Sequence, residues 1–160
     1  MPNIHVQVDC TLQHIADWSV LGDWIGKQIQ PEWDLPWGMM PHIIGLPEYI
    51  SFDQKKALTA AAANYGCPML WAEGVSPTPP EYEPQGRLLF TEDVLDERYT
   101  ELAPTGQVDL VVIGCPQASV GEVRTTAAAV RNRMELGQRI PDQRLWVFTS
   151  GHNHILLEQE

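Results

Sequence analysis

The sequence predicts an α/β protein built around a mainly parallel sheet. Short apolar runs alternate along the 160 residues with segments whose apolar residues recur at helical spacing. Such alternation is typical of βαβ units with right-handed crossovers. Two Ser-x-x-Gln/Glu patterns within the alternation also indicate helix starts. Because the sequence contains no internal repeat, low-complexity tract or heptad pattern, we expect a single α/β domain over residues 1–160.

The first third of the chain is expected to contain two strands separated by a helix and a loop. Ile4, Val6 and Val8 alternate with polar residues, which indicates a half-exposed strand at an edge of the sheet. Prolines and glycine make residues 31–41 an irregular loop, and residues 42–44 form the next strand. The helix between them is amphipathic, and its apolar residues are Ile15, Trp18, Leu21, Trp24, Ile25 and Ile29.

The middle of the chain is expected to form a helix, a strand, a loop and a second helix. Ser51 and Gln54 form a capping box that opens an alanine-rich helix, and Gly66 ends it in the left-handed conformation that glycine favours. A strand and a proline-rich loop follow over residues 68–84. Residues 91–102 form a helix whose first turn carries acidic residues, which complement the helix dipole.

The segment from Val108 to Glu122 is the most informative part of the chain. Residues 108–113 are a short, mostly β-branched apolar run, which is the pattern of a parallel strand covered on both faces. Gly114 permits a steep turn, and Ser119 forms a second capping box with Glu122 at the start of a helix. The segment therefore predicts a buried strand, a sharp turn and a capped helix.

Cys115 lies in that turn, at the carboxyl end of the strand and close to the helix N-terminus. The partial positive charge of a helix N-terminus favours a thiolate, and ligands of open α/β sheets bind at this edge. We therefore interpret Cys115 as a candidate nucleophile or metal ligand. The helix that follows reaches about residue 137, residues 145–148 form a further strand, and a last helix begins at His152.

Composition and charge exclude several classes of function. The formal net charge of −11 argues against a nucleic-acid partner, because such partners are bound by clustered Lys and Arg. No run approaches the ~20 apolar residues of a membrane span, and the N-terminus lacks a signal-peptide pattern. Three widely spaced cysteines are typical of reduced thiols rather than a disulfide framework, which indicates a cytoplasmic protein.

Several segments of the chain, in their order and spacing, resemble a known family. The Gly114-Cys115-Pro116 turn is followed by Ala118-Ser119 and Glu122, and the flanking segments that match are Asp17–Gly22 with Ile25-Gly26, Ile43–Pro47, Glu73–Pro77 and Trp146–Ser150. Together they resemble the large subunit of the aconitase X dehydratases. The resemblance runs from near the start of the chain to its end, but it covers only the central portion of the family pattern.

The resemblance implies a three-layer, aconitase-like α/β/α fold and a hydro-lyase reaction. The substrate would be a small hydroxy acid such as mevalonate 5-phosphate or cis-3-hydroxy-L-proline. An iron–sulfur cluster would act on the leaving hydroxyl, with Cys115 as one of its ligands. A small swivelling subunit or domain and the remainder of the large subunit would complete the site. We expect the chain to be a piece or remnant of such an enzyme that is inactive alone, and the general base is not identified.

The resemblance also implies three substrate-binding residues. Gln117 stands where the family commonly has His, so it can form hydrogen bonds but cannot transfer a proton. Thr149 and Ser150 match a Thr-Ser turn that often continues with Arg, here replaced by Gly151. An arginine there would bind a carboxylate or phosphate through two hydrogen bonds, so its replacement weakens the case for anion recognition.

Other interpretations compete with the dehydratase. Gln117 and Gly151 favour a non-catalytic α/β interaction module, or a remnant of the family, which would keep the fold and need neither cluster nor substrate. A thiol enzyme that uses Cys115 ranks last, since no His is placed beside it. A metal site at His152 and His154 lacks a third ligand. If the chain is a fragment, its exposed apolar surface is expected around Trp33, Trp37 and the last helix.

Overall fold

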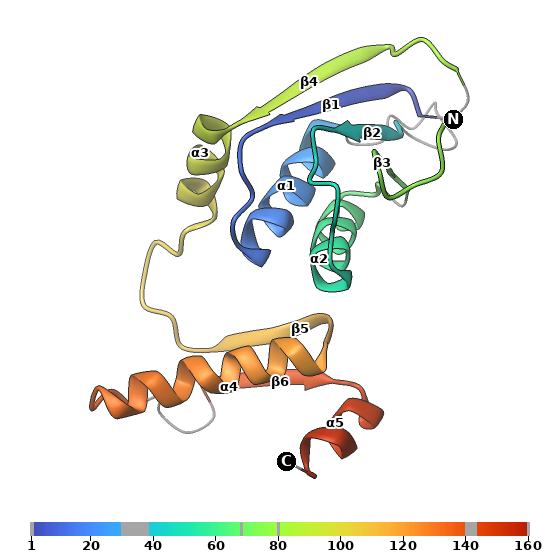
Figure 1. Cartoon of the computed structure of the whole chain (residues 1–160). Helices are drawn as coiled ribbons and strands as arrows, with labels where there is room; N and C mark the ends of the chain where they lie inside the picture. Colours follow the sequence, from blue (N-terminus) through green and yellow to red (C-terminus); the bar gives the residue numbers. More distant parts are fainter. Residues whose placement is uncertain (1, 30–38, 68, 80, 140–143, 160) are drawn as a thin grey trace. The chain divides into compact units, whose positions relative to one another are not determined.

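The computed structural model describes residues 2–29, 39–67, 69–79, 81–139 and 144–159, and it divides into two compact units. Unit 1 is Met1–Ala103 and unit 2 is Pro104–Glu160. Figure 1 shows the elements of both units, and we describe each unit by itself. The sequence indicates one domain over the whole chain. That both units belong to one domain stays a prediction.

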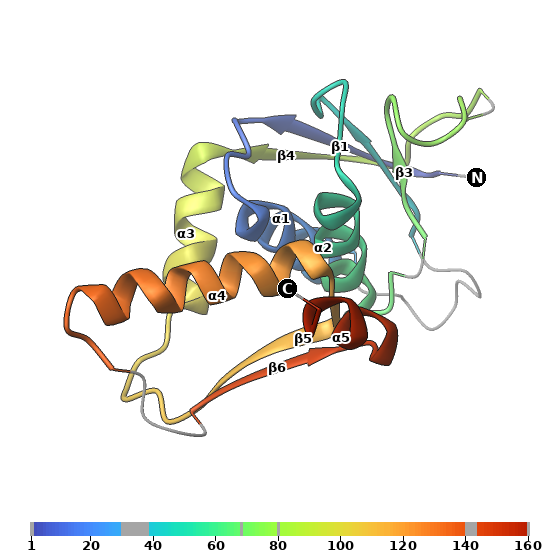
Figure 2. The ribbon, with the colours of Figure 1, turned by 60° about the horizontal axis from the view of Figure 1, so that its bottom comes forward.

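Unit 1 is a parallel sheet with helices on one face. Its strands are β1 (Ile4–Asp9), β2 (Pro41–Ile44), β3 (Trp71–Ala72) and β4 (Gly86–Thr91), and its helices are α1 (Ile15–Gln28), α2 (Phe52–Ala63) and α3 (Glu92–Leu102). The sheet has the order β3-β2-β1-β4, and every pair is parallel. Figures 1 and 2 show α1 and α2 side by side beneath this sheet. The expected parallel α/β arrangement is therefore confirmed.

The position of β1 corrects one expectation from the sequence. The alternation in this strand indicated a sheet edge, but β1 lies between β2 and β4. The error arose because β4 was not recognised between a proline-rich loop and a helix. Ile4, Val6 and Val8 are buried against the helices, whereas His5 and Gln7 face away from them. The alternation therefore reports one covered face and not an edge.

Two glycines set how closely α1 and α2 approach. A Cβ atom added to Gly22 would lie 2.2 Å from the carbonyl oxygen of Leu58, and one added to Gly26 would lie 2.8 Å from the ring of Tyr65. Spaced four residues apart, the two glycines lie on one side of α1 and admit the backbone of α2. The core that results includes the fully buried Trp18.

Unit 2 is smaller and has a two-stranded sheet. Its elements are β5 (Val111–Ala118), α4 (Val120–Glu135), β6 (Leu145–Thr149) and α5 (Gly151–Leu157), and β5 pairs with β6 in parallel. The sequence placed this strand at residues 108–113, covered on both faces. The strand is present at residues 111–113 but begins later and extends to Ala118, and the expected burial is wrong, since Val111 and Val112 are 46% and 53% exposed. Among the described residues β5 pairs with β6 alone, so the two-stranded sheet is too narrow to bury this strand.

The helix boundaries follow local rules that the sequence reveals. Ser51 accepts a hydrogen bond from the N–H of Gln54, whose side chain accepts one from the N–H of Ser51, and Ser119 and Glu122 do the same at α4. Gly66 has a φ of 85°. Both predicted capping boxes and the predicted glycine stop are confirmed.

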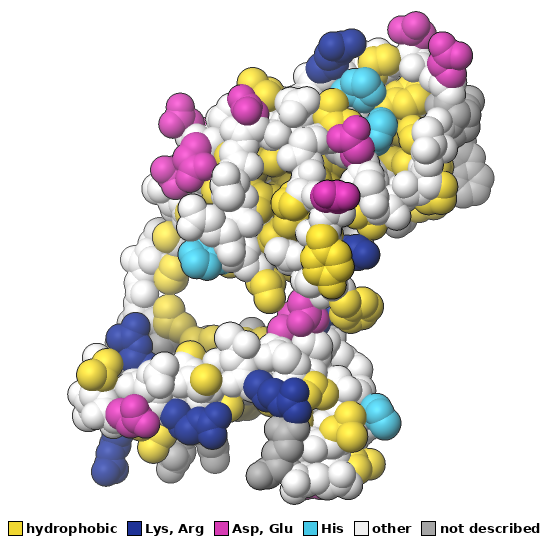
Figure 3. Space-filling view, viewed as in Figure 1, with side chains coloured by type: hydrophobic (Ala, Val, Ile, Leu, Met, Phe, Trp, Pro, Cys, Tyr) yellow, Lys and Arg dark blue, Asp and Glu magenta, His cyan; other side chains and the backbone are white. Residues whose placement is uncertain are grey.

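The chain's negative charge belongs mostly to unit 1. Residues 1–103 contain 15 Asp and Glu against five Lys and Arg, and residues 104–160 contain six against five. Figure 3 shows acidic side chains spread over unit 1 on one face of the molecule. Among the described residues, no helix is long and apolar enough to cross a membrane. Trp33 and Trp37, expected to be exposed, lie outside the described residues.

Candidate functional site

The Gly114–Gln117 segment forms a bulge at the carboxyl end of β5. Ile113 pairs with Val147 and Ala118 pairs with Thr149, so four residues of β5 lie opposite a single residue of β6. Extra residues that cannot join the ladder are pushed out of the strand. The bulge therefore displays residues 114–117 at the edge where ligands of parallel sheets bind.

Gly114 is required by this geometry. Its φ is 123°, a conformation that L-residues rarely adopt, and an added Cβ would lie 2.2 Å from the carbonyl oxygen of Phe148. The peptide bond from Cys115 to Pro116 is cis. The expected break after Ile113 is therefore a bulge within β5 and not a turn that ends the strand, and it depends on β6 passing directly beneath Gly114.

Cys115 is exposed on the bulge, whereas the other two cysteines lie in unit 1 and are less accessible. Cys67 is part of the hydrophobic core, and burial raises the pKa of its thiol to about 11. Burial, with a smaller effect of the Glu92 carboxylate, also raises the pKa of Cys10. Because a thiolate is the metal-binding and nucleophilic form, Cys115 is the cysteine best placed to act. Cys67 therefore has a structural role in the core of unit 1.

Thr149 and Ser150 lie at the same carboxyl edge as the bulge, at the end of β6. The Thr149 hydroxyl donates a hydrogen bond of 2.6 Å to the carbonyl oxygen of Ala118, and Ser150 accepts one of 3.1 Å from the N–H of Asn153. Ser150 is thus the N-cap of α5, and Thr149 fastens β6 to the end of β5. Both residues lie at the sheet edge that carries Cys115, and each forms a hydrogen bond that stabilises the fold of unit 2.

These structural bonds leave both hydroxyls able to meet a ligand. Thr149 uses its proton and keeps a lone pair, while Ser150 uses a lone pair and keeps its proton. Gln117 is an exposed residue of the bulge. The arrangement therefore offers a thiol, an amide and a hydroxyl donor around the end of a two-stranded sheet, close to the capped N-terminus of α4. It can supply hydrogen bonds and an exposed thiol.

The fit to an iron–sulfur cluster is partial. Such clusters are held by several thiolates, and at this edge the described residues supply one exposed thiol. The described part of the chain contains no group of three His, Cys, Asp or Glu side chains placed to hold a metal ion. His152 and His154 lie on the short helix α5, where residues two apart do not share a face, and His154 is 3.2 Å from Glu158. Cys115 fits as one ligand of an incomplete set.

Asn153 is a site residue that sequence reasoning passed over. Its side-chain amide donates a hydrogen bond of 3.2 Å to the carbonyl oxygen of Ala118, which Thr149 also contacts. These two bonds tie the start of α5 to the end of β5. A signal existed, since Asn is three residues after the N-cap Ser150, but the partner is 35 residues away in sequence.

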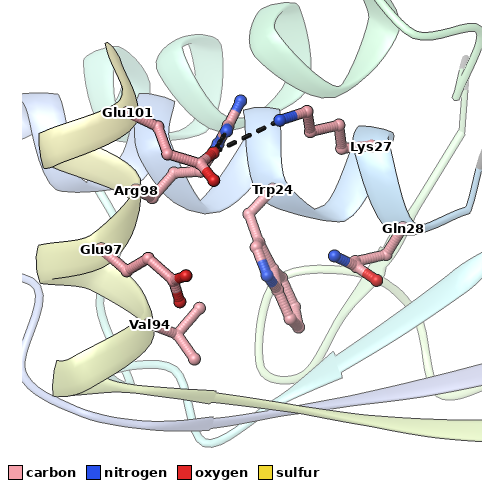
Figure 4. Close-up of a pocket in the computed structure, with 7 residues that line it drawn as sticks. All are labelled: Trp24, Lys27, Gln28, Val94, Glu97, Arg98 and Glu101. Carbon is pink, nitrogen blue, oxygen red and sulfur yellow. Dashed lines mark hydrogen bonds and ion pairs between the residues drawn. The ribbon is translucent and has the colours of Figure 1, made fainter. Parts of the chain in front are cut away.

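A charged cavity in unit 1 is structural in character. It has a volume of about 180 Å³ and lies between α1 and α3, where Trp24, Glu97 and Arg98 line it (Figure 4). The Arg98 guanidinium is buried and binds Asp23 and Glu101, and Lys27 reaches the same Glu101 carboxylate at 3.3 Å. Lys27 and Arg98 together lower the pKa of Glu101. Lys27, Arg98 and Glu101 therefore satisfy one another, and this part of the cavity wall stabilises the packing of α1 against α3.

A comparison with known protein families identifies the family of the chain. The sequence profile of the family named aconitase X second domain matches residues 2–100, which are nearly the whole of unit 1. The chain belongs to the aconitase X family. The family that the sequence motifs indicated is thereby confirmed.

Two known aconitase X relatives extend the match into unit 2. The phosphomevalonate dehydratase large subunit of Methanothermobacter thermautotrophicus is 31% identical over 157 residues, which cover 92% of this chain and 34% of that protein. The crystal structure of the holo-form of Thermococcus kodakaraensis aconitase X covers 99% of this chain and 39% of its own, with a TM-score of 0.79 and 22% identity. The structural likeness confirms the aconitase-like α/β fold. The chain spans about a third of the length of the curated relative.

Proposed function

We propose that this chain is part of a cytoplasmic hydro-lyase that removes water from a small hydroxy acid and that it is inactive alone. The observation that carries the proposal is the bulge that displays Cys115 beside the Thr149-Ser150 turn, in a chain of the aconitase X family. The curated relative is named a dehydratase, which supports elimination of water as the reaction class. Mevalonate 5-phosphate and cis-3-hydroxy-L-proline are the substrates that we propose first.

Each residue of the edge has a role in this proposal. Cys115 is one ligand of an iron–sulfur cluster, which supplies a Lewis-acidic iron for the leaving hydroxyl. Gly114 sets the direction of the thiol, since the bulge depends on its backbone conformation. Gln117 donates or accepts a hydrogen bond at a substrate oxygen, and Ser150 donates its free proton to another. Thr149 holds the turn in place through Ala118.

The proposal requires partners that complete the site. The curated relative is named a large subunit, so a small swivelling subunit or domain is the partner that we propose for this chain. The remainder of the large subunit would supply the further cysteine ligands and the general base, because the described residues provide neither. The expected sequence of events is that the substrate binds between these parts and loses water there.

The coding sequence on both sides of this segment is the first test. A frame that stays open in both directions and encodes further cysteines would support the proposal. The encoded protein should then bind iron and sulfide under anaerobic conditions, and Cys115→Ser should lower its iron content and abolish dehydration, whereas Cys67→Ser should leave the iron content unchanged. Dehydration by residues 1–160 alone after anaerobic reconstitution would refute the proposed incompleteness, and unchanged iron in Cys115→Ser would refute the ligand.

The alternative is a non-catalytic α/β interaction module that keeps the family fold. The structural bonds of Thr149 and Ser150 favour it, since both residues have a reason to be present without a substrate. Gln117 and Gly151, which replace residues common in the family, favour it as well. In-frame stop codons on both sides of the coding segment, together with partner binding that Cys115→Ser leaves unchanged, would support the module instead.

A further inference from the structure

Unit 1 has a cavity on the side of the sheet that faces away from α1 and α2. Its volume is about 190 Å³. The residues that line it are His42 on β2, Trp71 and Ala72 on β3, and Glu73, Gly74, Ser76, Pro77, Thr78 and Pro79 of the segment that follows. The proposed dehydratase function assigns no role to any of these residues, because its site lies in unit 2.

The aromatic wall of this cavity is held in place before any ligand arrives. The indole N–H of Trp71 donates a hydrogen bond of 2.7 Å to the carbonyl oxygen of Pro77. Residues 72–76 form a tight loop held by two hydrogen bonds. The N–H of Ala72 donates to the Ser76 hydroxyl, and the N–H of Ser76 donates to the carbonyl oxygen of Ala72. A wall fixed in this way loses little conformational entropy on binding, which favours affinity.

The polar wall is equally well anchored. The N–H of Glu73 donates to the carbonyl oxygen of Ile43, and the Glu73 carboxylate accepts a bond of 3.4 Å from the N–H of Gly45. On the other side, His42 Nδ1 and the hydroxyl of Tyr82 share a hydrogen bond of 2.7 Å. The ligand-facing groups of the cavity are thus an aromatic ring, a carboxylate and an imidazole with one nitrogen engaged.

The charge around the cavity is negative. Residues 57–86 contain three Glu and no Lys or Arg. Burial, together with the neighbouring His5 imidazole, lowers the pKa of His42 despite the opposing effect of Glu73, and a lowered pKa favours the neutral imidazole. Arg87 lies in the same cross-strand row, but three strand spacings separate it from Trp71, which is about 14 Å. An anionic ligand would therefore meet the Glu73 carboxylate, and the lining residues of the cavity include no Lys or Arg to compensate it.

We propose that this cavity binds a compact organic cation, with its ammonium group between the indole of Trp71 and the carboxylate of Glu73. An aromatic face attracts a desolvated cation through the ring quadrupole, and indole does so best. A carboxylate on the same cavity wall adds Coulomb attraction. A methylated ammonium ion matches both features, because its methyl groups contact the ring while its charge faces the carboxylate.

The test uses choline as the probe and the 160-residue chain as the protein. Its readouts are the ¹H–¹⁵N signals of the Trp71 indole and the Gly74 amide, and the indole signal is assigned from its loss in Trp71→Phe. Choline should shift both signals saturably at millimolar concentration against sodium chloride of equal ionic strength. The neutral isostere 3,3-dimethyl-1-butanol should bind at least about threefold more weakly, since it lacks the charge.

Two carboxylate variants separate the cavity from general surface charge. Glu73→Gln keeps the acceptor for Gly45 and removes the charge, so choline should bind about threefold to fivefold more weakly. Glu48→Gln removes an exposed carboxylate outside the cavity lining and should leave binding unchanged. Equal binding of choline and its isostere, equal loss in both variants, or shifts caused by lactate in place of choline would overturn the proposal.

Discussion

Replacing Gly114 with Ala should destabilise unit 2 more than an equivalent change at any neighbouring glycine. The new Cβ would meet two obstacles: a φ of 123° and the carbonyl oxygen of Phe148 at 2.2 Å. Strain at such a backbone position costs about 1–3 kcal/mol. Relieving the overlap requires β5 and β6 to separate by about 1 Å, which adds about 1–3 kcal/mol as for other overpacked sites. We expect a total loss of about 2–6 kcal/mol.

Two other glycines of unit 2 serve as matched controls. Gly137 has a φ of 77° and open space around it, so Gly137→Ala should cost only the strain of the left-handed region, about 1–2 kcal/mol. Gly151 has neither a positive φ nor a contact within 4 Å and is the first residue of α5. Gly151→Ala should therefore be neutral or slightly stabilising, because alanine is the better helix former.

The assay is urea unfolding monitored at Trp146, the single tryptophan of residues 104–160. Labelling with 5-fluorotryptophan and assigning the ¹⁹F signal with Trp146→Phe isolates unit 2 from unit 1. The free energy of unfolding should fall in the order Gly151→Ala, Gly137→Ala, Gly114→Ala. A loss in Gly114→Ala no larger than that in Gly137→Ala would refute the argument, because it would mean that β6 does not lie against Gly114.

Three further predictions concern groups whose surroundings the structure defines. Arg98→Met should lower the free energy of unfolding of unit 1 by about 3–5 kcal/mol, because it leaves the Asp23 carboxylate without its buried partner. In a double-mutant cycle, adding Asp23→Asn to Arg98→Met should recover part of that loss. At pH 8, 5,5′-dithiobis(2-nitrobenzoate) should react quickly with Cys115 and slowly with the buried Cys67; a fast phase that survives in Cys115→Ser would contradict this. Burial opposes the charged form of Asp17, but its hydrogen bonds outweigh burial and lower its pKa, so the stability that this carboxylate adds is present above the unfolded pKa of about 4 and is lost as the pH falls below it. The difference in unfolding free energy between the wild type and Asp17→Asn should therefore shrink as the pH falls through that range. A constant difference would argue against the lowered pKa.

The sequence alone determined the features that depend on neighbours along the chain. Ser51 and Ser119 begin helices because each bonds backbone and side-chain groups three residues away, and such a pattern is visible without a structure. Gly66 ends a helix for an equally local reason, its positive φ. The order and spacing of short motifs also identified the aconitase X family, which the match over residues 2–100 confirms.

Only the tertiary structure decided the features that depend on distant partners. β1 is an interior strand because β4, about 80 residues later, pairs with it, and no pattern within β1 reveals that neighbour. Thr149 was interpreted as a substrate-binding residue, and its bond to Ala118, 31 residues earlier in the chain, became visible only when β5 and β6 were placed together. Local hydrogen bonds leave a signature in spacing, whereas strand pairing and cavity walls join residues far apart in sequence, so single-sequence patterns do not record them.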